Sequence, residues 1–261
     1  MIEEPYRWVE AIANRREYIE DQLASGGPIA CLSCAAGILF LSAGRERQKI
    51  FEIYDRIAMG AVGHPGDIER LRMAAIEVAS TEGFTRSASD VSLRRLAAYS
   101  LSPALKTAFE QVYGAPYLVR MLFAELGRGS APNLFVRIEY DGSLHTNGGM
   151  LGRSFEDFGV ISGTASSTEW MEQFLKGKSL AQAPLEEALR TALETWSVGR
   201  LGLAPDAPKE LPAAEAIAAH LKEHLADLEV EAALLERAAR MPATFRPIGA
   251  GELEPILAIF R

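Results

Sequence analysis

Residues 28–63 read PIACLSCAAGILFLSAGRERQKIFEIYDRIAMGAVG, and this one segment sets the class of fold. Its short apolar runs, bounded by turn residues, are typical of β-strands. The predicted strands are Ile29–Ser33, Ile38–Ser42, Lys49–Ile53 and Ile57–Val62. Gly37 ends the first turn between them, and Tyr54-Asp55-Arg56 forms the last. Connections this short allow only antiparallel neighbours, because a parallel pair needs a crossover of about a dozen residues. The segment therefore predicts two hairpins.

The rest of the chain places helices between and after groups of strands. Predicted helices begin at Asp67 and near Ser87–Asp90, the second reaching Tyr113 with a kink at Pro103. Further strands are predicted at Leu118–Leu126, Asn133–Glu139, Phe158–Ser162, Leu228–Leu235 and Phe245–Ile248. Further helices are predicted at Thr168–Leu175, Pro184–Ser197 and Ala213–Ala226, with a loop at Val198–Pro212. No helix crosses between neighbouring strands, so we predict an α+β fold, a four-layer α-β-β-α sandwich of two antiparallel sheets.

A separate helix precedes the first strand. Pro5 suits its first position, where a missing N–H costs nothing. Apolar residues then recur at helical spacing up to Leu23, and Gly26-Gly27-Pro28 ends the helix. An amphipathic helix of this length is marginal alone in water, so its apolar stripe needs a surface to cover it.

Composition narrows the class of protein. The net charge of −8 argues against a nucleic-acid binder, whose surface is basic. No apolar run approaches the roughly 20 residues that span a bilayer, and Met1–Pro5 lacks the features of a signal peptide. We therefore expect a cytoplasmic protein with no membrane or nucleic-acid partner.

Two patterns invite a metal or redox interpretation. Cys31 and Cys34 form a C-x-x-C pair, but residues three apart on a strand point to opposite faces, so we expect buried, diverging thiols. His220 and His224 stand four apart on a helix, as two zinc ligands would, yet no third ligand accompanies them. We expect no metal and no cofactor.

Several short segments, in order along most of the chain, resemble one family. They are Gln48–Ile57, Ala61–Gly63, Leu71-Arg72, Glu82–Phe84, Asp90–Ala97, Phe123–Glu125, Arg137–Ser143, Ser162–Thr164, Leu228–Val230 and Phe245–Ile248. Together they are similar to proteasome α-type subunits, most of all the actinobacterial type. The first helix agrees, because α subunits carry it and mature β subunits lack it.

The resemblance implies an organisation and a set of partners. Residues 1–26 would be the α-type helix and gate region, and residues 27–261 an N-terminal-nucleophile hydrolase fold with an insertion at about 198–227. The chain would form a homo-oligomeric ring, expected to be seven-membered, that gates a proteolytic chamber. Its partners would be β-type subunits with an N-terminal threonine and a ring-shaped ATPase activator. The segment before the first helix is shorter than the tails that form the usual gate.

The resemblance also assigns roles to particular residues. Gly27 stands where β subunits carry the threonine nucleophile, so no catalytic residue is expected; the nearest hydroxyls are Ser25 and Ser33. Lys49 matches both the catalytic lysine of β subunits and the lysine of the α-subunit pocket that receives activator tails. In the second role, Gly63 and His64 would supply backbone donors beside it. A solvated lysine at a strand end is the third possibility.

Three functions remain open at this point. The first is a non-catalytic α-type subunit of a threonine-type peptidase complex. The second is a self-compartmentalising N-terminal-nucleophile hydrolase that processes its own chain. The third is a proteasome-like ring that acts as a scaffold without a protease partner.

Overall fold

The computed structural model of the chain describes residues 5–45, 48–111, 113–146, 156–204, 210–239 and 243–260, with the backbone alone for residues 5–7. Its strands form two five-stranded sheets. Sheet A has the order β10 (Phe245–Pro247), β9 (Glu229–Glu236), β2 (Gly37–Gly44), β1 (Ile29–Cys34) and β8 (Phe158–Ile161). Sheet B has the order β3 (Ile50–Tyr54), β4 (Ile57–Gly63), β5 (Val119–Glu125), β6 (Leu134–Ile138) and β7 (Leu144–Thr146). Every neighbouring pair is antiparallel, as predicted.

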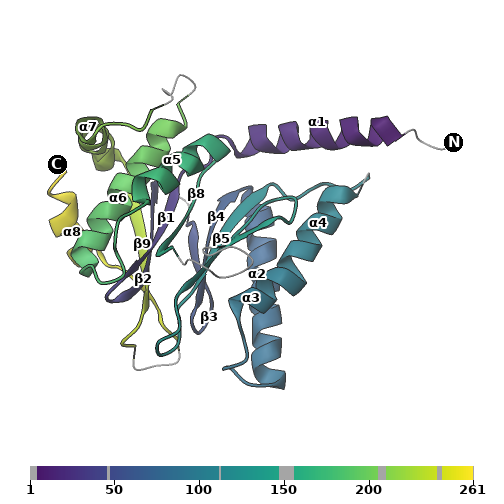
Figure 1. The fold of residues 1–261 in the computed structure, drawn as a ribbon, viewed down its shortest axis with the longest axis horizontal. Coiled ribbons are helices and arrows are strands. Elements are labelled where there is room, and N and C mark those ends of the chain that lie inside the picture. Colours follow the sequence, from purple (N-terminus) through teal and green to yellow (C-terminus); the bar gives the residue numbers. More distant parts are fainter. Residues whose placement is uncertain are drawn as a thin grey trace.

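Helices cover the outer face of each sheet. On sheet B lie α2 (Pro65–Thr85), α3 (Leu93–Leu96), a π-helical turn (Ala97–Leu101) and α4 (Ser102–Glu110). On sheet A lie α5 (Ala165–Leu175), α6 (Leu185–Gly202), α7 (Ala214–His224) with a 3₁₀ turn (Leu225–Asp227), and α8 (Ala250–Leu257). Figure 1 shows the two sheets between these helix groups, with the first helix, α1 (Pro5–Leu23), projecting past one end. The predicted four-layer α-β-β-α sandwich is confirmed.

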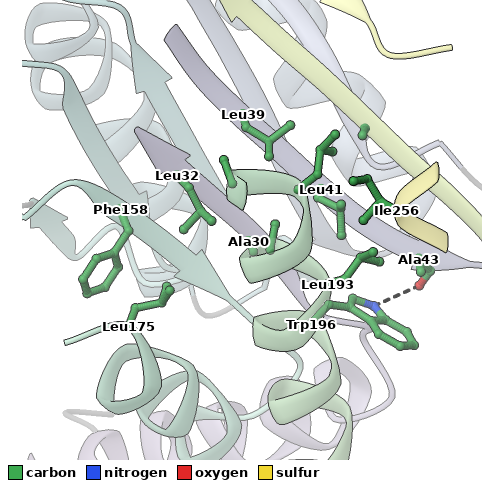
Figure 2. Packing of buried hydrophobic residues seen from close by; sticks show 14 of the residues in the cluster. Ala30, Leu32, Leu39, Leu41, Ala43, Phe158, Leu175, Leu193, Trp196 and Ile256 are labelled. Carbon is green, nitrogen blue, oxygen red and sulfur yellow. Dashed lines mark hydrogen bonds between the residues drawn. The ribbon is translucent and has the colours of Figure 1, made fainter. Parts of the chain in front are cut away.

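Three apolar layers hold the sandwich together. Between the sheets, β1 and β2 contribute Cys31 and Phe40, which pack with Leu122 of sheet B. The layer between sheet A and its helices is shown in Figure 2, where Trp196 of α6 lies under the end of β2. Its indole Nε1 donates a hydrogen bond of 3.2 Å to the carbonyl oxygen of Ala43. Burying large apolar side chains of this kind is the main stabilising contribution to a domain of this size.

The two cysteines diverge as predicted. Cys31 faces the inter-sheet layer, whereas Cys34 faces the helices of sheet A. Burial raises the pKa of both thiols, so neither is a ready thiolate.

Two predicted boundaries were wrong. The loop expected from Val198 starts later, because α6 continues to Gly202. Gly199 does not break the helix; a Cβ there would lie 2.6 Å from the sulfur of Met171 and 2.7 Å from Pro28, so glycine permits close packing. The long helix predicted to begin near Ser87–Asp90 begins at Leu93 and continues without a break through α3, the π-helical turn and α4 to Glu110, with Pro103 close after the π-helical turn.

Two elements were not predicted. β7 is a three-residue edge strand, too short to show a period in the sequence. α8 contains Pro255, which argues against a helix when read from the sequence alone, yet Leu253 and Ile256 bury its inner face.

Candidate functional site

The first helix, α1, contacts the body from Ile12 to its C-terminal end. Ile19 and Leu23 are fully buried against Phe109 and Tyr140. On the same helix Trp8, Val9 and Tyr18 are 43%, 67% and 52% exposed. The helix predicted from Tyr6 to Leu23 is thus present, and its outer half offers apolar side chains that the described residues do not cover.

A buried arginine joins α1 to the ends of three strands. Arg120, near the start of β5, donates to the Glu20 carboxylate of α1 at 3.2 Å and to Glu139 at 2.5 Å. It also donates to the carbonyl oxygens of Ser162 at 2.8 Å and Gly163 at 3.0 Å, just after β8. A buried guanidinium needs this many acceptors, because an unpaired charge is costly away from water.

Close backbone contact continues this junction to the turn before β1. The Gly163 N–H donates to the Gly26 carbonyl at 2.9 Å, and the Gly26 N–H donates to the Leu23 carbonyl at 2.8 Å. A Cβ on Gly26 would lie 2.0 Å from Cγ1 of Val62, so only glycine fits there. The chain between α1 and β1 is therefore held tightly against the body.

An open cleft of about 650 Å³ lies beside this turn. Its lining includes Gly27, Lys49, Phe51, Gly63, Pro65 and Glu69. A second cavity of about 350 Å³ adjoins Lys49 from the other side and is lined by Gly44, Gln48, Glu229 and Glu231 among others. Lys49 thus borders both hollows.

The Nζ atom of Lys49 lies close to the place where a side chain on residue 27 would begin. A Cβ built on Gly27 would lie 2.6 Å from the Lys49 Nζ, and one built on Gly44 would lie 3.8 Å from it. The predicted alignment of Gly27 with Lys49 is therefore reproduced in space. Of the two hydroxyls considered as alternatives, Ser25 is exposed after α1, whereas Ser33 is buried and accepts a hydrogen bond from Asn133 at 2.9 Å.

The ammonium of Lys49 has no ion-pair partner in the part of the chain that the structure describes. Burial lowers the pKa of the Lys49 ammonium, the negative charge of Glu231 raises it, and the positive charge of Arg200 lowers it further. Both carboxylate oxygens of Glu231 accept hydrogen bonds from the backbone, one from the Lys49 N–H at 2.8 Å and one from the Ile50 N–H at 3.0 Å. The arrangement leaves a half-buried cation that faces a cleft, which suits an incoming anion.

The start of α2 forms another wall of the cleft. Gly63 adopts φ +137°, and a Cβ there would lie 2.0 Å from the Leu118 carbonyl oxygen, so this position requires glycine. The His64 N–H donates to that same carbonyl at 2.8 Å, and the His64 carbonyl accepts from Asp67 and Ile68 at 3.0 Å each. His64 is therefore the N-cap of α2, with its own N–H already engaged. The structure brings Lys49 and Gly63 to one cleft and gives His64 a positioning role.

Sequence reasoning missed Glu231. The signal was faint: a carboxylate in a strand whose later residues are buried, with an exposed Glu229 two positions before it. Burial raises the pKa of Glu231, and the two backbone N–H donors act against this.

The two predicted helical histidines form a packed pair. Their rings stack at 4.4 Å, and His220 Nδ1 lies 2.8 Å from the Ser197 hydroxyl. Burial, His224 and Arg200 lower the pKa of His220 to about 4. Among the described residues, no group of three or more metal-ligating side chains comes together. Nor does any described helix have the length and apolar character needed to cross a membrane.

Comparisons with known proteins agree on one family. The family model described as "Proteasome subunit" matches residues 36–167. "Proteasome subunit alpha" of Kineococcus radiotolerans is 33% identical over 95% of this chain and 94% of its own length. The proteins of that name from a Nocardioides strain and from Streptomyces coelicolor are 31% and 28% identical, each over 95% of this chain and over 86% and 87% of their own lengths.

Proposed function

We infer a function from one premise, that this chain belongs to the proteasome family as an α-type subunit of the actinobacterial kind. We propose that it is a non-catalytic subunit of the outer ring, which gates entry to a proteolytic chamber in the cytoplasm. Residues 1–26 would then be the assembly and gate region, and residues 27–261 the body.

The form of α1 supports ring formation. Its outer half carries Trp8 and Val9 into solvent, and Tyr18 is exposed nearer the body; exposed apolar side chains gathered on one element mark an interaction surface. A second copy of the chain is the natural occupant in a homo-oligomer. A closed ring, seven-membered in our proposal, would cover the same surface on every copy.

The relation of Lys49 to Gly27 supports a role without catalysis, and this is the observation that carries the proposal. Gly27 lies beside the lysine ammonium and has no side chain that could act as a nucleophile. A threonine mechanism also requires a free N-terminus at that position. Here α1 continues the chain before Gly27 and is bonded to the body through Arg120.

The cleft supports docking of an activator tail. Lys49 offers an ammonium that has no ion-pair partner among the described residues, Gly63 lines the same cleft, and His64 caps the helix whose N-terminus borders it. The first N–H groups of a helix lack internal partners and favour anions. We propose that the terminal carboxylate of a ring-shaped ATPase binds here, against Lys49.

Co-expression with a β-type subunit tests the proposal. The chain alone should show no peptidase activity, and a threonine-directed epoxyketone should label only the β-type subunit in the assembled particle. Intact mass should show this chain with α1 retained. Labelling of this chain, or loss of the residues before Gly27, would instead favour a self-processing hydrolase. Rings that never recruit a β-type subunit would favour a scaffold.

A further inference from the structure

Glu231, which lines the second cavity beside Lys49, connects the two sheets. It belongs to β9 of sheet A, whereas Ile50 is the first residue of β3 of sheet B and Lys49 directly precedes it. Its Oε2 accepts from the Lys49 N–H at 2.8 Å and its Oε1 from the Ile50 N–H at 3.0 Å. One carboxylate thus accepts from two successive backbone N–H groups where β3 begins.

The backbone of Lys49 is held from the other side as well. Its carbonyl oxygen accepts from the Ala61 N–H of β4 at 3.0 Å. With both its N–H and its C=O engaged, the residue has little freedom to turn. Its side chain runs between Gly27 and Gly44, where Cβ atoms would lie 2.6 Å and 3.8 Å from Nζ.

Glu231 acts on the Lys49 ammonium through its charge, while its hydrogen bonds go to backbone N–H groups. Both oxygens of Glu231 are used by backbone N–H groups, and no ion pair joins the carboxylate to Nζ within the described residues. Its negative charge nevertheless raises the pKa of Lys49 against the effects of burial and of Arg200. Glu231 therefore favours the charged form of Lys49 without forming an ion pair with it, and the ammonium has no ion-pair partner among the described residues.

We propose that Glu231 is the positioning residue of the cleft: by clamping the backbone of Lys49 and Ile50, it aims the Lys49 ammonium and sets the affinity of the cleft for a chain-terminal carboxylate. The inference rests on the proposed docking function. It adds a residue that makes no contact with the tail itself.

The test compares Glu231→Gln with Lys49→Ala and with a matched control, Glu229→Gln. The glutamine keeps the size of Glu231 but puts an N–H₂ group against a backbone N–H. Glu229 lines the same second cavity from the same strand, so its substitution removes an equal charge without touching the clamp. Glu231→Asp keeps the charge but has a shorter side chain that cannot reach both N–H groups. This variant replaces Glu231→Gln in the test if Glu231→Gln does not fold.

The first measurement is peptide binding to the assembled particle. The probe is a fluorescent ten-residue peptide with the C-terminal sequence of the ring-shaped ATPase of the same organism, as free acid and as amide. Loss of a charge-assisted hydrogen bond corresponds to about 10-fold weaker binding or more. We expect that loss for the free acid with Lys49→Ala and Glu231→Gln, and a change under about 2-fold with Glu229→Gln.

The second measurement does not depend on docking. Lys49 is labelled with an amine-reactive reagent across a range of pH, and the extent is read by peptide mass spectrometry. Glu231→Gln should shift the labelling profile of Lys49 to lower pH by more than Glu229→Gln does. Circular dichroism and particle mass confirm that each variant folds and assembles.

The outcomes separate the two proposals. If Lys49→Ala weakens binding and Glu231→Gln changes neither binding nor labelling, Glu231 is not a positioning residue. If Lys49→Ala binds the peptide normally, the docking function is wrong. The labelling profile of Lys49 in Glu231→Gln and Glu229→Gln then decides alone for or against the role of Glu231. Equal effects of Glu231→Gln and Glu229→Gln in both measurements also overturn the inference, because charge rather than the clamp would be responsible.

Discussion

The Nζ atom of Lys49 lies where a side chain on Gly27 would begin, 2.6 Å from the position of its Cβ. The resemblance to proteasome subunits aligns Gly27 with the threonine nucleophile of β subunits, whereas a lysine at position 49 matches both α and β subunits. Gly27 has no side chain, so no nucleophile stands beside the Lys49 ammonium at this position, and both residues line the same cleft.

Two neighbouring glycines should respond differently to alanine. In Gly27→Ala the new methyl group meets only the flexible end of Lys49, so unfolding free energy should change by less than about 0.5 kcal/mol. In Gly26→Ala it meets Val62 at 2.0 Å and the Leu23 carbonyl at 2.9 Å, which should cost about 1–3 kcal/mol. Thermal unfolding of both variants checks this, and an equal cost would contradict it.

Lys49→Ala should weaken each activator tail by roughly 10- to 100-fold, the value of a charge-assisted hydrogen bond. Several tails bind one ring, so avidity multiplies the loss. The measurement is activator-dependent degradation of a folded protein by intact particles. Small-peptide cleavage is the control and should stay nearly unchanged; its loss would give Lys49 a catalytic role.

The exposed half of α1 should control assembly and not folding. Trp8→Glu with Val9→Glu places charges on a surface that we propose is covered in the ring. The variant should melt within a few degrees of wild type but stay monomeric or poorly assembled by mass photometry. Glu10→Gln, on the same exposed stretch, is the control. Full rings in the double variant would show that α1 is not the assembly element.

Arg120→Met should destabilise the fold by about 3–5 kcal/mol, because it leaves Glu139 and two carbonyl groups without their buried partner. Arg16→Met is a matched control, since Arg16 is 55% exposed and pairs with Asp141 at 3.2 Å. An exposed pair of that kind contributes under about 1 kcal/mol. Urea unfolding of both variants measures the difference, and similar values would remove the special role of Arg120.

His220 should make folding sensitive to acid. Its pKa is lowered from 6.5 in the unfolded chain to about 4 in the fold. Between these values the unfolded state binds a proton that the folded state does not, so stability falls as pH drops from 6.5 to about 4. Partial exposure reduces the loss to about 1–2 kcal/mol.

The measurement for His220 is the free energy of unfolding at several pH values. The slope in this range should flatten in His220→Gln. His145→Gln, on the exposed edge strand β7, should keep the wild-type slope. An unchanged slope in His220→Gln would show that other groups cause the acid sensitivity.

The fold was largely readable from local pattern, and the misreadings have particular causes. Hairpins such as β1–β2 are visible because the register is set by a short turn and by alternating faces. Gly199 was misread because the sequence shows a glycine but not Met171 and Pro28, which approach it. The need for a close approach comes from tertiary packing, which no local window contains.

The site was half readable for a similar reason. Lys49 and Gly63 were predicted together because the resemblance implies that both line the pocket of α subunits, and they are close in sequence. Glu231 is 182 residues away from Lys49, and its role depends on which strands of the two sheets meet at one end. His64 was predicted to offer its backbone N–H to a ligand, but that N–H already donates to the Leu118 carbonyl. The sequence around His64 does not show which segment lies opposite it.

The junction of Gly163 with Gly26 also determines how α1 can move. A Cβ on Gly163 would lie 2.5 Å from the Leu23 carbonyl, and Arg120 ties Glu20 to the same place. Helix α1 therefore has no hinge where it joins the body, and turning it would drag Gly26 and Gly27 along. In the ring that we propose, a force on the outer half of α1 would therefore reach the edge of the cleft, and the seating of the adjacent molecule would alter the shape of that cleft.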